Sequence, residues 1–429
     1  MLKHGHKDTG SNKRPRLIFL VPSLAGGGAE KTASTLLPYL VQAFDVTLAL
    51  LENRRTYPVP DKLRVVAFSG RLDSPAAHLV RIPCHVMAMV QLVRKRQPGV
   101  VLSFMEQANI INILSSRITG HSAVISQRTE PYRQHAGKGL LGRLILHASR
   151  LFYPMASQVI AVSAGIRRVL VGRYGLAPER VIVIPNPVHL ESLRDQSMSL
   201  PPAGIPQRFL LHVGRISLTA KAQDVIIEAF HILHQRHTDL SLVLVGEGPD
   251  RRRVKRQVHD LSLENAVVLA GWQDNVAAFM SRAEVFVLAS RYEGWPNALA
   301  EAMACGCPVV ATDCETGPRE MLGDSEYGLL TPVDDPEAVA HSVERLLTDK
   351  SGREYFQKQA RKRAQDFGIE YIGPEYVRVL RNKESPKMRC ENEESLISSP
   401  FLRKVVETSM QVCVATLRGT YFVLFNKSL

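Results

Sequence analysis

The sequence lacks several patterns that would assign it to a familiar class of protein. It has six cysteines in 429 residues, none of them in a C-x-x-C pair, and nothing near them completes a tetrahedral metal site. Residues 1–16 are polar and basic without an apolar segment, so no signal peptide is expected. No uncharged apolar run is long enough for a transmembrane helix. We therefore expect reduced thiols, no metal and a cytoplasmic location.

Two common nucleotide-binding motifs are also missing. The first apolar run, Arg16–Ser23, is followed by Gly26, Gly27 and Gly28, but these do not form G-x-G-x-x-G, and no P-loop occurs. A glycine-rich turn between a strand and a helix lets the backbone approach a ligand closely. Tight packing alone would explain these glycines equally well.

Acidic residues are scarce in the first half of the chain. Residues 1–200 contain 26 Lys and Arg against 11 Asp and Glu, whereas residues 201–429 contain 28 against 30. This asymmetry indicates an anionic partner for the N-terminal half, such as phospholipid headgroups, a lipid-linked diphosphate or nucleic acid. No nucleic-acid-binding module is recognisable, so nucleic acid is not an expected partner.

Two predicted helices, Ala76–Arg96 and Gly139–Met155, combine large apolar side chains with arginines. Basic amphipathic helices of this kind can lie on an anionic membrane surface. A helix that faces the core and exposes a basic side would have the same composition. Both interpretations stay open, and the basic half makes an anionic membrane surface a candidate partner.

Short apolar runs alternate with helical segments along most of the chain, which predicts parallel, doubly wound sheets. Ligands bind such sheets at the carboxyl ends of the strands. In the N-terminal half, Asn109 and Arg128 follow predicted strands, and Gly27 and Gly28 follow the first one. These four residues are our candidates for lining a ligand cleft on that side.

The most informative segment follows a buried strand at Val285–Ser290. Pro296 fits the first turn of a helix that runs to Ala304, and Gly306 ends it. Glu301 lies inside this helix among apolar residues, and a buried carboxylate needs hydrogen-bonding partners.

Vicinal hydroxyls of a ribose or a hexose are such partners for a carboxylate. The amides of Gly294–Asn297, at the start of the helix, suit a phosphate. One loop and helix could therefore bind a sugar, a diphosphate and a ribose in a row, as in a nucleotide sugar.

Glu293 and Glu301 have the E-x7-E spacing of retaining GT-B glycosyltransferases, and the surrounding S-R-Y-E-G-W-P-N-A-L-A-E-A-M-A-C-G-C-P-V-V resembles the donor-binding core of the family 4 type. This large family includes bacterial lipopolysaccharide, capsule and lipid-linked-oligosaccharide transferases. The resemblance implies that Glu293 binds hydroxyls of the transferred sugar and Glu301 binds the ribose.

A second stretch, Val213-Gly214-Arg215 with Lys221 six residues later, resembles the V-G-R…K pattern of the same family. The resemblance implies that Arg215 and Lys221 neutralise the donor diphosphate, although isolated residues of this kind are ordinary surface cations. It also places Gly246 near the nucleotide. Trp272 falls where relatives hold the base, but a core tryptophan is equally compatible with the sequence.

Two departures from the family pattern matter. Glu315 and Thr316 replace the Pro and Ser of T-D-C-P-S-G-P-R-E, which leaves the donor sugar open. Many relatives have a histidine after the fifth strand, where this chain has Ser126-Gln127-Arg128-Thr129-Glu130-Pro131; His121 and His135 do not match it. No catalytic histidine is assigned, and by resemblance the leaving diphosphate can take the acceptor's proton.

The sequence thus predicts an α/β protein of the GT-B type, with two Rossmann-like domains facing each other across a cleft. The expected parts are a disordered stretch 1–15, an acceptor-binding domain 16–189, a linker 190–207, a nucleotide-sugar-binding domain 208–370, a crossover helix 371–384 and an unassigned extension 385–429. The predicted catalytic residues are Glu293, Arg215 and Lys221. The predicted donor-binding residues are Glu301, Gly294, Trp295, Pro296, Asn297, Gly214, Gly246, Trp272 and Leu299.

The expected reaction is retaining, metal-independent transfer of a hexosyl group to a lipid-linked or cell-surface glycan, on the inner face of the cell membrane. The donor is expected to be a UDP-hexose or UDP-N-acetylhexosamine, with no further cofactor. A glycogen-synthase-like enzyme with a soluble acceptor, a nucleotide-sugar epimerase and a basic nucleic-acid binder are the alternatives.

Overall fold

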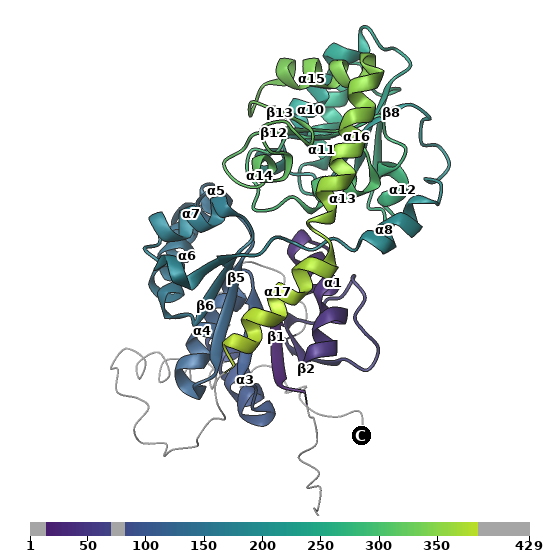
Figure 1. The fold of residues 1–429 in the computed structure, drawn as a ribbon. Coiled ribbons are helices and arrows are strands. Elements are labelled where there is room, and N and C mark those ends of the chain that lie inside the picture. The colour runs from purple at the N-terminus through teal and green to yellow at the C-terminus, as the bar shows by residue number, and fades with distance from the viewer. Residues whose placement is uncertain (1–13, 70–81, 385–429) are drawn as a thin grey trace, which may run out of the picture.

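A computed structural model describes residues 14–69 and 82–384. The predictions for residues 1–13, 76–81 and 385–429 lie outside the described residues. The described residues form two parallel sheets, one in the lower domain and one in the upper domain of Figure 1.

The N-terminal sheet has the strand order β3-β2-β1-β4-β5-β6-β7. Its strands are β1 (Arg16–Val21), β2 (Asp45–Glu52), β3 (Arg64–Ser69), β4 (Val100–Phe104), β5 (Ser122–Gln127), β6 (Gln158–Ala161) and β7 (Val181–Val183). The connecting segments include α1 (Gly28–Ala43), α3 (Ile82–Arg96), α4 (Glu106–Thr119), α5 (Pro131–His135), α6 (Gly139–Phe152), α7 (Ala164–Gly172) and two 3₁₀ turns, Tyr153–Met155 and Pro178–Arg180.

The C-terminal sheet has the order β10-β9-β8-β11-β12-β13. Its strands are β8 (Phe209–Val213), β9 (Ser241–Val245), β10 (Val267–Gly271), β11 (Val285–Leu288), β12 (Val309–Thr312) and β13 (Leu329–Thr331). Its helices are α9 (Leu218–Lys221), α10 (Gln223–His234), α11 (Arg251–Asp260), α12 (Ala277–Met280), α13 (Asn297–Cys305), α14 (Pro318–Leu322), α15 (Pro336–Thr348) and α16 (Lys350–Gln365).

The central strands are nearly continuous runs of Val, Leu, Ile and Phe, and every residue of β4, β11 and β12 is buried. Such runs fit parallel strands that helices cover on both faces. The strand order reverses between β1 and β4 and again between β8 and β11, and ligands of this architecture bind beside such reversals. The prediction of two doubly wound, Rossmann-like domains is confirmed.

The predicted linker 190–207 contains a helix that was not predicted. Residues Leu190–Ser197 form α8, which packs against α12 and α13 of the C-terminal domain. Residues 198–207 form no helix or strand, so only this second part of the segment is a linker.

The chain returns to the N-terminal domain through α17 (Ile369–Asn382), which lies along α1 in Figure 1. Tyr376 and Leu380 are fully buried there in one apolar cluster with Leu36 and Leu40 of α1. Because the last helix completes the core of the first domain, the two domains are joined by two separate connections.

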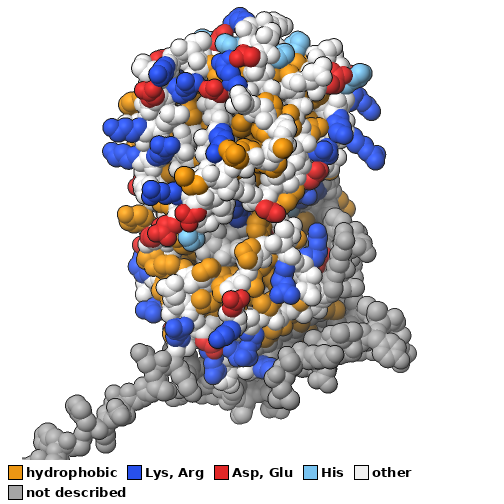
Figure 2. Space-filling view, turned by 90° about the vertical axis from the view of Figure 1, so that its right-hand side faces the viewer, with side chains coloured by type: hydrophobic (Ala, Val, Ile, Leu, Met, Phe, Trp, Pro, Cys, Tyr) orange, Lys and Arg blue, Asp and Glu red, His pale blue; other side chains and the backbone are white. Residues whose placement is uncertain are grey.

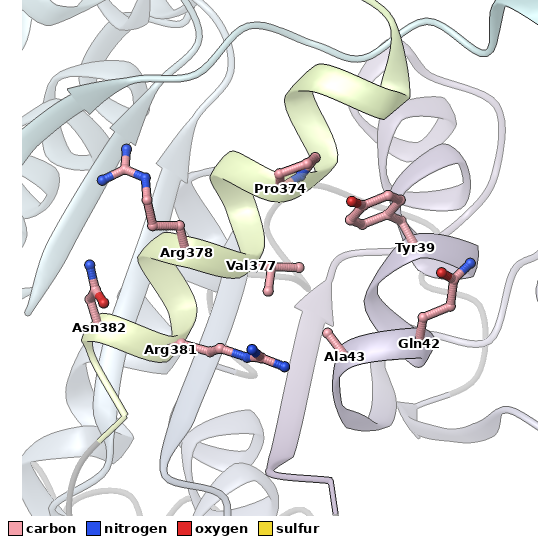
Figure 3. Close-up of a pocket in the computed structure, with 8 residues that line it drawn as sticks. All are labelled: Tyr39, Gln42, Ala43, Pro374, Val377, Arg378, Arg381 and Asn382. Atoms are coloured by element: carbon pink, nitrogen blue, oxygen red, sulfur yellow. The ribbon is translucent and has the colours of Figure 1, made fainter.

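A groove of about 550 Å³ runs between the end of α1 and α17 and is lined by Tyr39, Val377 and Arg381, among others (Figure 3). Tyr39 is eleven residues along α1 from Gly28, which at 1.5 Å per residue places the groove roughly 16 Å from the start of that helix. The groove is therefore remote from the carboxyl ends of the strands, where a ligand site is expected.

Candidate active site

Glu293 lies in the loop that leads from β11 to α13, and its carboxylate is buried against polar partners. Ser290 Oγ donates a hydrogen bond to Glu293 Oε1 over 2.7 Å, and Lys221 Nζ forms an ion pair with the same oxygen. Thr316 Oγ1 donates to the backbone carbonyl of Glu293. These contacts fix one predicted catalytic carboxylate beside one predicted catalytic cation.

The approach of Lys221 depends on a break between two helices. Lys221 ends the short helix α9, and Ala222 then adopts a left-handed conformation, φ +48°, before α10 begins. This left-handed residue separates the two helices, so that Lys221 ends α9 and its ammonium group reaches Glu293 in the loop after β11.

Arg215 follows β8 and has an exposed side chain. Its backbone carbonyl accepts a hydrogen bond of 3.0 Å from the side chain of Gln223. A Cβ atom at Gly246, after β9, would lie 2.0 Å from the carbonyl oxygen of Gly214, so the ends of these strands touch. The backbone of Arg215 is thus held at the edge of the sheet, and its exposed guanidinium can contact an anion.

Glu301 is buried on α13, as the sequence predicted, and its partner comes from the other domain. Lys31 Nζ of α1 lies 2.7 Å from Glu301 Oε1. Four residues earlier, Asn297 Nδ2 donates to the carbonyl of Gly28 over 2.9 Å and lies 3.2 Å from Thr32 Oγ1. The start of α13 therefore lies directly against the start of α1.

Gly294 allows an equally close contact at the end of β5. A Cβ atom at Gly294 would lie 2.2 Å from the carbonyl oxygen of Arg128, which is a backbone atom and cannot yield. Only glycine permits this approach of the two domains. Pro296, predicted in the first turn of α13, is the residue that caps it.

The side chains of Trp295 and Leu299 are buried in the core, where Trp295 packs edge-on against Phe367 with ring centroids 5.0 Å apart. The amide of Leu299 donates to the carbonyl of Pro296. Of these two predicted donor-binding residues, only Trp295 therefore keeps a backbone amide that could contact the donor.

Trp272 is not a core residue, because 45% of its surface is exposed. Its indole N–H donates to Asp274 over 3.0 Å. A Cβ atom at Gly26 would lie 3.3 Å from the Trp272 ring, and the Tyr57 ring lies 6.4 Å away, both from the N-terminal domain. Trp272 therefore borders the interdomain cleft beside the glycine-rich turn.

Asn109 does not line the cleft, contrary to the prediction. It is fully buried, with its oxygen accepting from Ser103 Oγ and its NH₂ group donating to Ser126 O and Tyr153 Oη. All these partners belong to the N-terminal domain. Asn109 joins the ends of two strands and has no group left for an acceptor.

Arg128 is also an internal residue and not the cleft contact that was predicted. Its guanidinium donates to Tyr376 Oη over 3.0 Å and to Asn186 Oδ1 over 2.5 Å, and it lies 4.2 Å from the centre of the Phe104 ring. Burial lowers the pKa of this guanidinium. The side chain thus ties α17 to the sheet, while its backbone carbonyl meets Gly294.

The two histidines near the family's histidine position lie elsewhere. His121 precedes β5, at the opposite end of the sheet from the cleft, and burial lowers its pKa to about 3. His135 is buried, with Nε2 3.6 Å from Glu106. Neither residue is adjacent to Glu293, Lys221 or Glu301.

A second contact between the domains involves the two positions that depart from the family pattern. Glu320 accepts hydrogen bonds of 2.6 and 2.7 Å from the amides of Ala164 and Gly165 at the start of α7. Next to it, Thr316 packs on Gly165, and Glu315 lies 3.7 Å from Arg173. This contact was not predicted, because it joins segments about 150 residues apart.

Glu30 was not among the predicted site residues, although it belongs to the glycine-rich turn and the helix that follows. A Cβ atom at Gly27 would lie 2.2 Å from Glu30 Oε2, so the carboxylate folds over the turn. Burial raises the pKa of Glu30, an effect that hydrogen bonds from the backbone amides of Glu30 and Gly27 and the charges of Arg215 and Arg128 offset only in part. Glu30 thus lies between the two domains, within electrostatic reach of the predicted phosphate-binding Arg215.

Within residues 14–69 and 82–384, no group of three or more His, Cys, Asp or Glu side chains is arranged to hold a metal ion. Over the same residues, no helix is both long and apolar enough to cross a bilayer.

Comparisons with known proteins agree with this geometry. The model of Glycosyltransferase Family 4 matches residues 26–192, and that of Glycosyl transferases group 1 matches residues 202–363. An N-acetylgalactosamine-N,N'-diacetylbacillosaminyl-diphospho-undecaprenol 4-alpha-N-acetylgalactosaminyltransferase of Campylobacter jejuni is 30% identical over 371 residues, 85% of this chain and 99% of that protein. A second Campylobacter jejuni protein, a GalNAc-alpha-(1->4)-GalNAc-alpha-(1->3)-diNAcBac-PP-undecaprenol alpha-1,4-N-acetyl-D-galactosaminyltransferase, is 22% identical over 85% of this chain and 98% of its own length.

Solved structures share the fold. Anabaena HepE in complex with UDP and glucose superposes with a TM-score of 0.72 at 20% identity, covering 86% of this chain and all of its own. Sucrose-phosphate synthase from Thermosynechococcus elongatus superposes with a TM-score of 0.74 at 21% identity, covering 86% of this chain and 99% of its own. At these identities the likeness concerns the fold alone.

Proposed function

Because this chain belongs to the glycosyltransferases of the GT-B fold that join a family 4 domain to a group 1 domain, we propose that it transfers a sugar from a UDP-sugar to a lipid-linked glycan, with retention of anomeric configuration. The observation that carries the proposal is that Glu293 pairs with Lys221 and Glu301, eight residues further along the same loop and helix, pairs with Lys31 of the other domain. Arg215 follows β8, the strand that pairs with β11.

The donor would lie along the loop and the start of α13. Glu293 would bind hydroxyls of the transferred sugar and Glu301 those of the ribose, since an ionised carboxylate accepts several hydrogen bonds. The amides of Gly294–Asn297 would face the diphosphate, because unpaired N–H groups at a helix start favour anions. Lys31, which contacts Glu301, would then share that carboxylate with the ribose or move aside.

Transfer would form a bond from the acceptor oxygen to the anomeric carbon and break the bond from that carbon to the diphosphate. The nucleoside diphosphate leaves with the electron pair, so negative charge grows on it. Arg215 and Lys221 would stabilise this charge without a metal ion. A diphosphate oxygen on the same face is one destination for the acceptor's proton, which would make a histidine unnecessary.

Two features support a lipid-linked acceptor. The Campylobacter relatives are named for glycans on diphospho-undecaprenol, and α6 presents an unusual surface. Leu140, Leu144 and Leu151 of α6 are 73%, 59% and 55% exposed. Since they are four and seven residues apart, they share one face of the helix.

The basic side chains of α6 lie next to these leucines. Arg143, His147 and Arg150 are exposed, and the sequence GLLGRLILHASRLF contains no acidic residue. A leucine stripe with flanking cations fits the boundary between headgroups and acyl chains of an anionic bilayer. We infer that the protein binds the inner face of the cell membrane through α6, which lies at the left of the lower domain in Figure 1.

The opposite side of the molecule offers a contrast. On the face shown in Figure 2, Lys and Arg side chains are spread over both domains and do not gather in one patch. The basic excess of the N-terminal half alone therefore does not define a membrane surface on this face, and the argument depends on α6.

The function is tested by incubating the protein with a panel of UDP-sugars and undecaprenyl-diphosphate-linked glycans and measuring UDP release and product. Acceptor-dependent UDP release with an α-linked product from an α-linked donor is expected. An inverted product would remove the retaining assignment, and conversion of the donor to its epimer without UDP release would replace transfer by epimerisation.

The membrane contact is tested by flotation with vesicles that contain an anionic phospholipid, compared with vesicles of zwitterionic lipid alone. We expect the wild type to float at low salt, and the variant Leu140→Ser, Leu144→Ser, Leu151→Ser to stay at the bottom with unchanged melting temperature. Equal flotation of both proteins would show that α6 is not the contact.

A further inference from the structure

Gln223 is the first residue of α10, and its side chain is fully buried against residues 214–222, the segment that carries Arg215 and Lys221. Ala222, with φ +48°, separates α10 from α9 at this point. The V-G-R…K pattern includes the arginine and the lysine of this segment but not Gln223. A buried side-chain amide needs partners for its oxygen and its N–H groups, and these partners show what Gln223 holds.

The amide of Gln223 is paired at both ends. Its Oε1 accepts a hydrogen bond of 3.1 Å from the backbone N–H of Ser217. Its Nε2 donates to the carbonyl of Arg215 over 3.0 Å and lies 3.1 Å from Nε2 of His212. Because the N–H of Ser217 can only donate, it identifies the oxygen end of the amide. The two N–H groups then face Arg215 and His212.

His212 extends these contacts into the sheet. Its ring is buried on β8, and Nδ1 lies 2.9 Å from the carbonyl of Val287 on β11. Since a carbonyl only accepts, Nδ1 carries the hydrogen, and Nε2 of the neutral ring accepts from Gln223. Burial, aided by the charge of Lys221, lowers the pKa of His212 to about 4 against the opposing effect of the bond to Val287. The ring is therefore neutral near pH 7 and keeps this arrangement.

The contacts of Gln223 reach both predicted phosphate-binding residues. Arg215 is held directly through its carbonyl. Lys221 is held through Ser217, whose carbonyl accepts from the amide of Lys221 over 2.7 Å. A Cβ atom at Gly214 would lie 3.3 Å from Nε2 of His212 and 3.9 Å from Cδ of Lys221. One buried amide thus connects the backbones of the two cationic residues at the end of β8.

We propose that Gln223 is a positioning residue for the transfer reaction, whose amide, oriented by His212, holds Arg215 and Lys221 together at the place of the leaving diphosphate. This deepens the proposed function and rests on it. Gln223 is buried and acts only through the two cations. Fixed charges stabilise a leaving group because they need not move as its charge develops, and a displacement of about 1 Å can cost about 100-fold in rate.

A purely structural role is the competing explanation, because the same segment has other supports. The amide of Ile216 donates to the carbonyl of Glu247 over 3.0 Å. The amide of Leu218 donates to the carboxylate of Asp250, also over 3.0 Å. These bonds attach the segment to the turn after β9 and do not involve Gln223. The fold can therefore persist in a Gln223 variant while the two cations shift locally.

The first variant is Gln223→Met, which has a side chain of similar length without the hydrogen bonds of the amide. We expect kcat to fall about 10- to 100-fold, with the KM of the donor raised less than about threefold, because the cations act mainly on charge that grows in the transition state. Gln158→Met is the matched control. Gln158 is a buried glutamine of the N-terminal domain that donates to the carbonyl of Arg180 over 2.7 Å, so its loss should lower the melting temperature without lowering kcat.

A second variant keeps the test informative if Gln223→Met does not fold. His212→Phe retains a ring on β8 but removes the acceptor that orients Gln223, whose bonds to Arg215 and Ser217 remain possible. We expect the same signature, a lower kcat with little change in the KM of the donor, with a smaller fold-change than for Gln223→Met.

The decisive comparison introduces each of these two substitutions into Arg215→Ala, Lys221→Ala. Residues that act through a shared partner show non-additive effects. Because Gln223 acts only through the two cations, we expect no further fall in kcat beyond about twofold in this background. A general structural defect would instead lower kcat by the same factor with and without the two cations.

The proposal is overturned by a wild-type kcat in Gln223→Met, by an equal fall in kcat in both backgrounds, or by the same fall in Gln158→Met. If Gln223→Met does not fold, the same outcomes for His212→Phe decide it. Each of these results would leave the proposed transferase intact. Failure of the wild type to release UDP with any donor and acceptor would overturn the proposed function itself.

Discussion

The two sides of the cleft differ in how their residues are supplied. On the C-terminal side, Glu293 and Glu301 come from one continuous loop and helix, and Lys221 reaches Glu293 from the end of α9. On the N-terminal side, the residues at the cleft are Gly28 and Lys31, whereas two candidates at strand ends are internal. Position at a strand end locates a ligand site only when the side chain is not needed for packing.

The largest effect should come from the C-terminal side. The double variant Arg215→Ala, Lys221→Ala removes both cations that would stabilise the leaving diphosphate, and we expect kcat to fall about 1,000-fold or more. Steady-state UDP release measures it. The pair Arg252→Ala, Lys255→Ala on the exposed side of α11 is the matched control and should leave kcat unchanged.

If the double variant retained most of its turnover, the charge stabilisation that we assign to this side would be wrong. A fall in kcat with little change in the KM of the donor would identify an interaction made mainly in the transition state.

The next effect concerns donor affinity. Glu301→Gln keeps the shape of the side chain but removes the charge that would accept ribose hydroxyls, so we expect the Kd of UDP to rise about tenfold, close to 1.4 kcal/mol. Titration calorimetry measures it directly. Lys31→Met also breaks the pair with Glu301, so an equal loss of affinity in that variant would assign the effect to the ion pair and not to the ribose.

On the N-terminal side we expect a loss of stability without a specific loss of substrate binding. Arg128→Met removes the guanidinium that donates to Tyr376 and Asn186 and leaves these two buried acceptors unpaired. This should lower the free energy of unfolding by about 3 kcal/mol. Thermal or urea unfolding measures this change. The exposed Arg117→Met on α4 should have almost no effect.

An Arg128→Met protein with normal stability and a raised KM for the acceptor would contradict this prediction. Arg128 would then be a residue of the ligand cleft, as the sequence predicted.

The smallest effect concerns one hydrogen bond of the same contact, between Arg128 and Tyr376. Tyr376→Phe deletes only the hydroxyl that accepts from Arg128, and we expect a loss of about 1 kcal/mol. Because α17 completes the first domain, the loss should appear in its unfolding and not in UDP affinity. A changed UDP affinity with unchanged unfolding would show that α17 acts on the donor site instead.

Much of the fold followed from the sequence because its strands are continuous apolar runs, such as Val285–Ser290 and Val100–Phe104, separated by helical patterns. The residues of the loop and α13 were found because they are contiguous and resemble a known motif. A contiguous motif does not show which side chains face a ligand, however, and the side chains of Trp295 and Leu299 in the same motif are buried in the core.

The remainder depends on contacts between distant segments, which no local pattern encodes. The pairing of Lys31 with Glu301, the bonds of Glu320 to the start of α7 and the return of α17 join residues roughly 150 to 350 positions apart. The break at Ala222 and the helix α8 were not predicted, because tertiary packing overrode the local composition of those stretches.

The central claim is that Glu293, Lys221, Glu301 and Arg215 together bind a nucleotide sugar, and a structure of the protein with a bound UDP-sugar tests it most directly. We predict the diphosphate within hydrogen-bonding distance of Arg215 and Lys221, the ribose at Glu301 and the hexose at Glu293. A UDP-sugar bound away from these four side chains would contradict the account.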